Sequence, residues 1–217
     1  MHFLDAWSRL APLDFARLLL PFAALAVAIL LPGRRVAALA ALAVGISMPL
    51  AFEMAELSLR LGWMLLWLAI AARVGSGDPD PEPDPTARPG GFESGAVGLM
   101  LGLALFVLLA AAIARQDLSP EQSRTVSYAI AIMTLGLLHL MLSRHLLRAM
   151  VAFAALGLGL QLLEQAARSV SLPGETADSG GILLGTALAV ALTARLATAR
   201  AQAGGGVWVS QAHDLHD

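Results

Sequence analysis

The stretch 125–166 reads TVSYAIAIMTLGLLHLMLSRHLLRAMVAFAALGLGLQLLEQA, and it decides the fold class. Two apolar runs, 125–142 and 146–166, flank a short polar break. About 20 mostly apolar helical residues are enough to cross the hydrocarbon core of a bilayer. Each run therefore predicts a membrane-spanning helix, and the polar break predicts a junction at one membrane surface.

The composition of the whole chain indicates the same class. Of the 217 residues, 58% are hydrophobic and 14% are charged, and the mean hydropathy is +0.73. A typical soluble domain is about half apolar and about a quarter charged. The formal net charge of −2 provides no basic field for nucleic acid, and the absence of cysteine excludes thiolate metal sites and iron–sulfur ligation.

Motifs of soluble catalysis are also absent from the sequence: no phosphate-binding glycine loop, zinc-protease helix or serine elbow occurs. We therefore expect no active site, cofactor or metal on this chain. If it belongs to an oxidoreductase or an ion-translocating complex, we expect it to be a non-catalytic subunit.

The same apolar pattern recurs on both sides of the opening stretch. The candidate spans are 15–31, two spans within 36–72 with a junction near 47–56, 92–114, 125–142, 146–166 and 181–198. A single span across 36–72 would reduce the count from seven to six. The sequence predicts an all-α, polytopic transmembrane bundle of about seven helices, arranged as three plus four.

A linker divides the chain in two. Residues 74–92 interleave prolines with acidic residues, which favours an extended, solvated segment outside the membrane. The expected organisation is a three-helix half at 1–73, this linker on the cytoplasmic side, a four-helix half at 93–200 and a tail at 201–217.

All 14 cations are arginine, and their distribution predicts the orientation. Eight lie on the side that contains the C-terminus: Arg34, Arg35, Arg73, Arg88, Arg144, Arg148, Arg195 and Arg200. Six lie on the other side: Arg9, Arg17, Arg60, Arg115, Arg124 and Arg168. Because cytoplasmic loops carry the excess of basic residues, a cytoplasmic C-terminus is expected.

Ionisable residues within membrane spans are functional candidates, because burying a charge in lipid is costly. Glu53, Glu56 and Arg60 are spaced three and four apart and would share one helix face. Two interpretations stay open. The stretch belongs to the third span, with Pro49 in its first turn, or it is a solvated turn between spans.

Two further candidates lie in later spans. His139 is in the cytoplasmic half of the fifth span, where an imidazole can relay protons or simply pack against its neighbours. Glu164, with Gln161, is near the outer end of the sixth span, where a structural role at the headgroup level is expected. Small residues, among them Gly157, Gly159, Gly181 and Gly185, predict close helix–helix packing.

Several motifs share their order and spacing with a known family. Arg144-His-Leu-Leu-Arg148 joins an apolar span containing Gly136 to a second apolar span. Arg60 and Arg73 lie thirteen residues apart, and Thr176-Ala177-Asp178 precedes the last span. The chain thereby resembles the K-type subunit of respiratory complex I and its larger relative, the E subunit of hydrogenase-4. The resemblance covers most of the chain.

This resemblance implies a subunit of a complex I-like or membrane-hydrogenase-like assembly in a bacterial inner membrane, packed against antiporter-like large subunits. Family members move protons along carboxylates in the helix after the arginine junction. Here Gly157 occupies the position of the family's glutamate, and Glu164 is the nearest carboxylate. The candidate path residues are Glu53, Glu56, Arg60, His139, Glu164 and Asp178, with Arg144 and Arg148 at the junction.

Three alternatives to an ion path stay open. The chain could be a structural or assembly scaffold, which the loss of the family glutamate favours. It could be a subunit of an inorganic-carbon transport complex. A self-contained carrier for a small solute would predict an internal repeat, which the three-plus-four division does not show.

Overall fold

The computed structural model of the chain describes residues 12–31, 33–51, 57–76, 119–142, 145–168 and 180–202, together with helical positions at 100, 104, 107 and 111. Six helices have defined bounds: α2 (Pro12–Leu30), α3 (Arg34–Ala51), α4 (Leu57–Gly75), α6 (Pro120–Leu142), α7 (Leu146–Arg168) and α8 (Gly180–Gln202). The expected all-α class is confirmed, whereas the described residues define six helices rather than seven.

The region 36–72 contributes to two helices. Helix α3 ends at Ala51 and α4 begins at Leu57. Pro49 lies in the last turn of α3, so the interpretation that placed it in the first turn of the third span is wrong. Glu53 and Glu56 fall between the two helices in sequence, outside the described residues.

Local hydrogen bonds explain where two of the helices begin. The Ser119 hydroxyl oxygen accepts from the Gln122 amide at 3.3 Å, and the Gln122 side-chain oxygen accepts from the Ser119 amide at 3.1 Å. This reciprocal capping box, followed by proline at the first helical position, starts α6 five residues before the apolar run. At α7, Nδ1 of His145 accepts from the Leu147 amide at 3.3 Å and caps the first turn.

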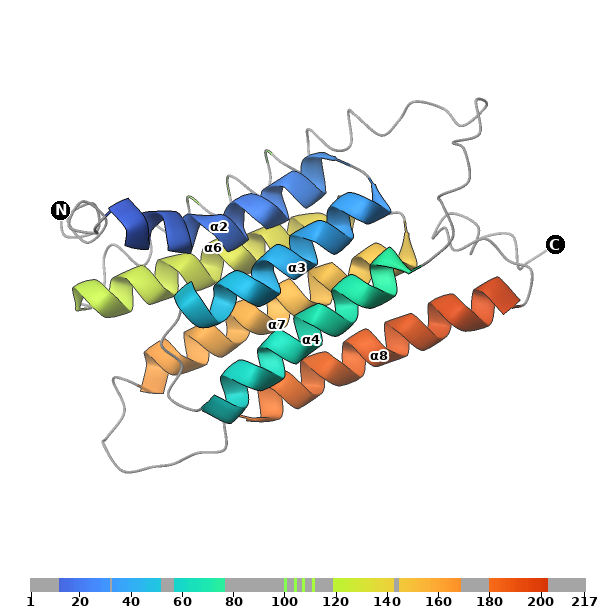
Figure 1. Cartoon of the computed structure of the whole chain (residues 1–217). Coiled ribbons are helices and arrows are strands. Elements are labelled where there is room, and N and C mark those ends of the chain that lie inside the picture. The colour runs from blue at the N-terminus through green and yellow to red at the C-terminus, as the bar shows by residue number, and fades with distance from the viewer. Residues whose placement is uncertain are drawn as a thin grey trace.

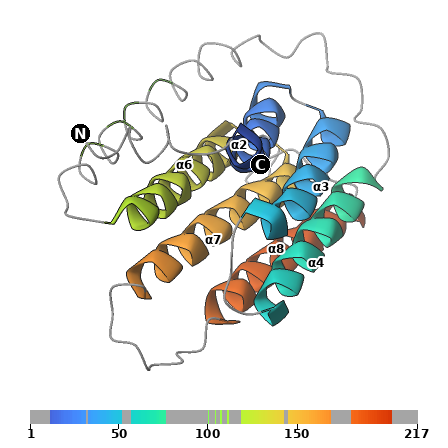
Figure 2. The same ribbon diagram turned by 60° about the vertical axis from the view of Figure 1, so that its left-hand side comes forward.

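The six helices form a single bundle, and successive described helices α2, α3 and α4, and then α6, α7 and α8, alternate in direction (Figure 1). Helix α7 packs against α3, α4, α6 and α8, which makes it the central element (Figure 2). Helix α2 also contacts α6. The helices of the two sequence halves therefore pack against one another instead of forming separate units.

This alternation gives the bundle two chemically different ends. Helices α2, α4, α6 and α8 finish where α3 and α7 begin, at the right of Figure 1. We call this the arginine-rich end; its described arginines are Arg34, Arg35, Arg73, Arg148, Arg195 and Arg200. The opposite, Glu164 end carries Arg60, Arg124, Arg168 and Glu164 among the described side chains.

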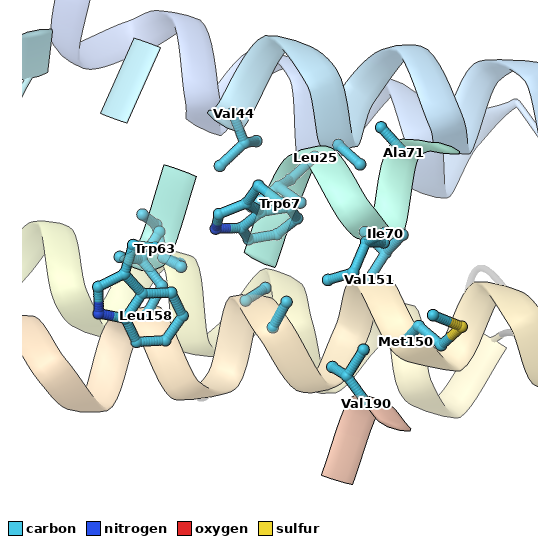
Figure 3. Packing of buried hydrophobic residues seen from close by; sticks show 14 of the residues in the cluster. Leu25, Val44, Trp63, Trp67, Ile70, Ala71, Met150, Val151, Leu158 and Val190 are labelled. Carbon is cyan, nitrogen blue, oxygen red and sulfur yellow. The ribbon is translucent and has the colours of Figure 1, made fainter. Parts of the chain in front are cut away.

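Two tryptophans fill the centre of the bundle. Trp63 and Trp67 on α4 are completely buried, and they lie between Val44 of α3 and Leu158 of α7 (Figure 3). Their spacing of four residues puts both rings on one face of α4. The indole nitrogens have no hydrogen-bond partner among the described residues, so these rings stabilise the bundle mainly by filling volume.

Glycines set the closest approach between α6 and α7. A Cβ at Gly159 would lie 2.8 Å from the Ala129 carbonyl oxygen, and one at Gly136 would lie 3.0 Å from the Leu156 amide nitrogen. Close packing at Gly157 and Gly159 is thus confirmed. Gly181 and Gly185 face open space, however, so their expected role in packing within this chain is wrong.

Four of the helices, α4, α6, α7 and α8, are long and apolar enough to cross a membrane. Helix α8 is the most exposed of them, because only 17% of its apolar window is buried, against 56% for α7. Large apolar side chains form a regular stripe along its surface: Leu184, Leu188, Leu192 and Leu196. The described residues therefore form a helical bundle with the character of a membrane protein.

Candidate functional site

His139 is the buried ionisable side chain with the least explained environment. It lies in the last turn of α6 and is 2% exposed. The Arg148 backbone lies close enough to form a weak hydrogen bond with the imidazole, but neither ring nitrogen has a well-aligned partner among the described residues. A buried polar group that lacks a well-aligned partner costs up to about 1–3 kcal/mol, so this imidazole is expensive for the fold. The ring keeps the capacity to accept or donate a proton.

Arg148 lies near His139 and joins α7 to α2. Its charge acts on the imidazole. One guanidinium nitrogen donates to the Ala28 carbonyl oxygen at 2.7 Å, in the last turn of α2. The last carbonyls of a helix have no partner within the helix, and a cation is favourable at this negative end of the helix dipole. Arg148 thus has a structural task, and it places a fixed positive charge beside His139.

The negative charge of Glu164 is balanced by an arginine on the same helix. Its carboxylate accepts from the Gln161 side-chain amide at 2.8 Å and forms an ion pair with Arg168, one turn later on α7. Glutamate four residues before arginine is the favourable order on a helix. Both members of the pair are partly exposed, at 26% for Glu164 and 34% for Arg168, so this carboxylate is not isolated in the apolar interior.

The remaining predicted residues are placed only in part. Arg60 lies in the first turn of α4 and is partly buried, at the Glu164 end of the bundle. Arg144 and Asp178, like Glu53 and Glu56, lie outside the described residues.

The structure does not bring His139 and Glu164 together. The contacts of Gly136 with Ala152 and of Gly159 with Ala129 set the antiparallel register of α6 and α7. In that register, Glu164 lies some 11–15 residues further along α7 than the α7 residues that face His139. This separation is about 20 Å along the axis of α7. Between them, α6 and α7 pack closely at Gly136 and Gly159, and the buried hydroxyls of Ser127 and Thr134 donate to carbonyl oxygens of α6 itself.

Gly157 is the contact point between α7 and α8. A Cβ there would overlap the side chain of Thr186 on α8. The Thr186 hydroxyl donates to the Ile182 carbonyl oxygen at 2.7 Å, so its only donor is used within α8. A side chain at position 157 would therefore require Thr186 or the helices themselves to shift.

One polar arrangement was missed by the sequence analysis. Arg73, at the end of α4, donates to the Thr198 hydroxyl oxygen of α8 at 2.6 Å, and that hydroxyl donates to the Ala194 carbonyl oxygen at 3.0 Å. Polar residues at 195, 198 and 202 share one face of α8, and this spacing was the available signal. Arg73 had been interpreted only as a basic helix end.

Comparisons with protein-family models, with curated proteins and with solved structures find no match. Among the described residues, no group of three or more histidine, cysteine or acidic side chains is placed so that it could hold a metal ion.

Proposed function

We propose that this chain is an integral-membrane, non-catalytic subunit that holds together a larger membrane complex. The contact between Gly157 and Thr186 carries this proposal. A proton-carrying subunit needs an ionisable group near the middle of its span, whereas here the middle of α7 is closed by helix packing. The ionisable side chains that the structure describes lie near the two ends of the bundle instead.

The course of the chain supports seven membrane crossings. Helix α4 ends at the arginine-rich end, and α6 begins at the opposite end (Figure 1). The connection between them has to pass from one side to the other, and 92–114 is long and apolar enough to do so. The arginine-rich end would then be cytoplasmic, together with the C-terminus.

The resemblance to the complex I and hydrogenase-4 subunits suggests which complex this is. The partners would be antiporter-like large subunits of a proton- or ion-translocating assembly in the bacterial inner membrane. The exposed leucine face of α8 offers an apolar surface to such partners or to lipid.

Isolation of the assembly tests this function. The tagged chain, extracted from its native membrane in a mild detergent, should co-purify with large antiporter-like subunits in fixed stoichiometry. Gly157→Ala, which forces α7 and α8 apart, should lower that recovery several-fold. The matched change Gly185→Ala meets nothing within 4 Å and should have no effect. A chain that is recovered alone, or that moves a solute by itself in proteoliposomes, would contradict the proposal.

A second candidate function is proton exchange at His139, which its burial without a well-aligned hydrogen-bond partner favours. In the reconstituted complex, His139→Phe should reduce proton movement about tenfold while the subunit composition stays the same, because phenylalanine fills the volume without binding a proton. His145→Asn is the control, since asparagine can still cap α7. Unchanged proton movement in His139→Phe would leave His139 a packing residue.

A further inference from the structure

An open groove lies between the ends of α4 and α8 at the arginine-rich end of the bundle. Its volume is about 360 Å³. The residues that line it are Arg73, Ala194, Arg195, Thr198, Ala199 and Gln202. Two of the six are cations and two are uncharged polar residues. The remaining two are alanines, whose small side chains leave the groove open. This groove plays no part in the function proposed above.

The groove exists because α4 and α8 touch at separate points. Near the Glu164 end, Gly62 of α4 lies against Leu183 of α8. At the arginine-rich end, the two helices are joined through the long Arg73 side chain, which reaches the Thr198 hydroxyl at 2.6 Å. That hydrogen bond fixes the direction of the guanidinium. A guanidinium has five N–H donors, so one bond to Thr198 leaves the group able to bind an anion as well.

An apolar track leads from the groove along α8. Arg195 is exposed, and it shares a helix face with the exposed side chains of Leu184, Leu188 and Leu192, one to three turns earlier. The basic groove at the end of the helices is therefore continuous with an apolar surface that extends for about three turns of α8. A ligand that matches both parts has an anionic head and a long hydrocarbon tail.

We infer that this groove binds the phosphate headgroup of an anionic phospholipid, with an acyl chain lying along the leucine face of α8. The inference requires only that the bundle is embedded in a membrane. Basic pockets between helix ends at a membrane surface are suited to anionic headgroups. The last turns of a membrane-spanning α8 lie at the depth of those headgroups.

Native mass spectrometry of the full chain in detergent tests this site, with phosphatidylglycerol and phosphatidylcholine as probes at equal concentration. Phosphatidylglycerol should be retained preferentially. Removing one surface arginine weakens the attraction of an anionic lipid by about fivefold. Arg195→Gln and Arg73→Gln should each reduce retention by about that factor, with phosphatidylcholine retention unchanged. Because Arg73→Gln also loses the bond to Thr198, the exposed Arg195 provides the variant that leaves the fold intact.

Arg35→Gln is the matched control. Arg35 is exposed at the same end of the bundle but does not line the groove. It should retain the lipid as the unmodified chain does. Equal losses in Arg35→Gln and Arg195→Gln would overturn the site, because the effect would then be diffuse attraction to a basic surface.

Two further results would overturn the inference. Inorganic phosphate at millimolar concentration should not displace the lipid; if it does, the groove is a simple anion site without an acyl-chain contact. Replacing the acidic residues of the linker tests whether they compete for these arginines: Asp78, Asp80, Glu82 and Asp84. If their replacement by Asn or Gln raises lipid retention several-fold, the groove is occupied by the linker in the unmodified chain.

Discussion

Helices α7 and α8 have the same length of 23 residues and almost the same hydropathy, but their surroundings differ. Among the described helices, α7 is surrounded by α3, α4, α6 and α8, whereas the extensive contacts of α8 are with α7 and α4. Glycine at 157 is pressed against Thr186, and glycine at 185 faces open space. Equal hydrophobicity therefore does not fix whether an apolar side chain meets protein or lipid. Substitutions matched between the two helices should separate these two roles.

The largest effect is expected for Gly157→Leu compared with Gly185→Leu. A leucine at 157 has to displace α8, and overpacking of this kind costs about 3 kcal/mol. Unfolding by SDS in mixed micelles, followed by the fluorescence of the buried tryptophans, measures the change. Gly185→Leu should unfold at the same SDS fraction as the unmodified chain. Similar losses in both variants would show that α7 and α8 are equally packed, against the structure.

A smaller effect is expected for Leu158→Ala, with Leu188→Ala as its partner. Leu158 is fully buried beside Trp63, whereas Leu188 is 61% exposed. Truncating the buried leucine leaves a cavity and should lower the free energy of unfolding by about 2 kcal/mol. The exposed leucine exchanges protein contacts for lipid or detergent contacts, so its change should stay within about 0.5 kcal/mol. The same SDS titration compares the two, and a large loss in Leu188→Ala would reveal a hidden contact on α8.

Arg148→Gln tests how the first turn of α7 is fixed to the bundle. The substitution removes the donor that binds the Ala28 carbonyl oxygen. A charged hydrogen bond that is only partly buried contributes about 1.5 kcal/mol, the lower end for charged donors. Hydrogen exchange at the end of α2 should accelerate in this variant. Arg35→Gln, at the same end, should leave that exchange unchanged.

The smallest effect is expected for Glu164→Gln. Its partner Arg168 is about one third exposed, so the ion pair should contribute at most about 0.5 kcal/mol. Thermal unfolding in bicelles should therefore be almost unaffected, and the small difference should shrink further at high salt. A loss of several kcal/mol would mean that the carboxylate has a buried role in the interior.

The sequence was sufficient for the class of fold and for part of its detail. Apolar runs bounded by arginines predicted the helices. Because successive helices alternate in direction, the same pattern also groups Arg34, Arg73 and Arg148 at one end of the bundle. The start of α6 was missed because the capping box of Ser119 and Gln122 lies ahead of the hydrophobic run. Gly181 and Gly185 were misjudged, since a glycine permits close packing but does not show whether a partner helix is there.

The candidate site was predictable only as a set of residue types. His139 was predicted from the sequence to lie within a span, and α6 is long and apolar enough to be one. Its burial without a well-aligned hydrogen-bond partner depends on α6 packing against its neighbours. The separation of His139 from Glu164 depends on the antiparallel register of α6 and α7. The bond between Arg73 and Thr198 joins residues that are 125 positions apart, and no local pattern links them.

A helical membrane bundle with one arginine-rich side was predictable from the residues alone, because apolar length and charge placement act locally along the chain. The enclosure of α7, the exposure of α8, the lack of room at Gly157 and the basic groove between α4 and α8 arise only when the helices pack together. These features depend on the distance between helix surfaces. That distance is set by which side chains meet across an interface, and the one-dimensional pattern of a helix does not contain this information.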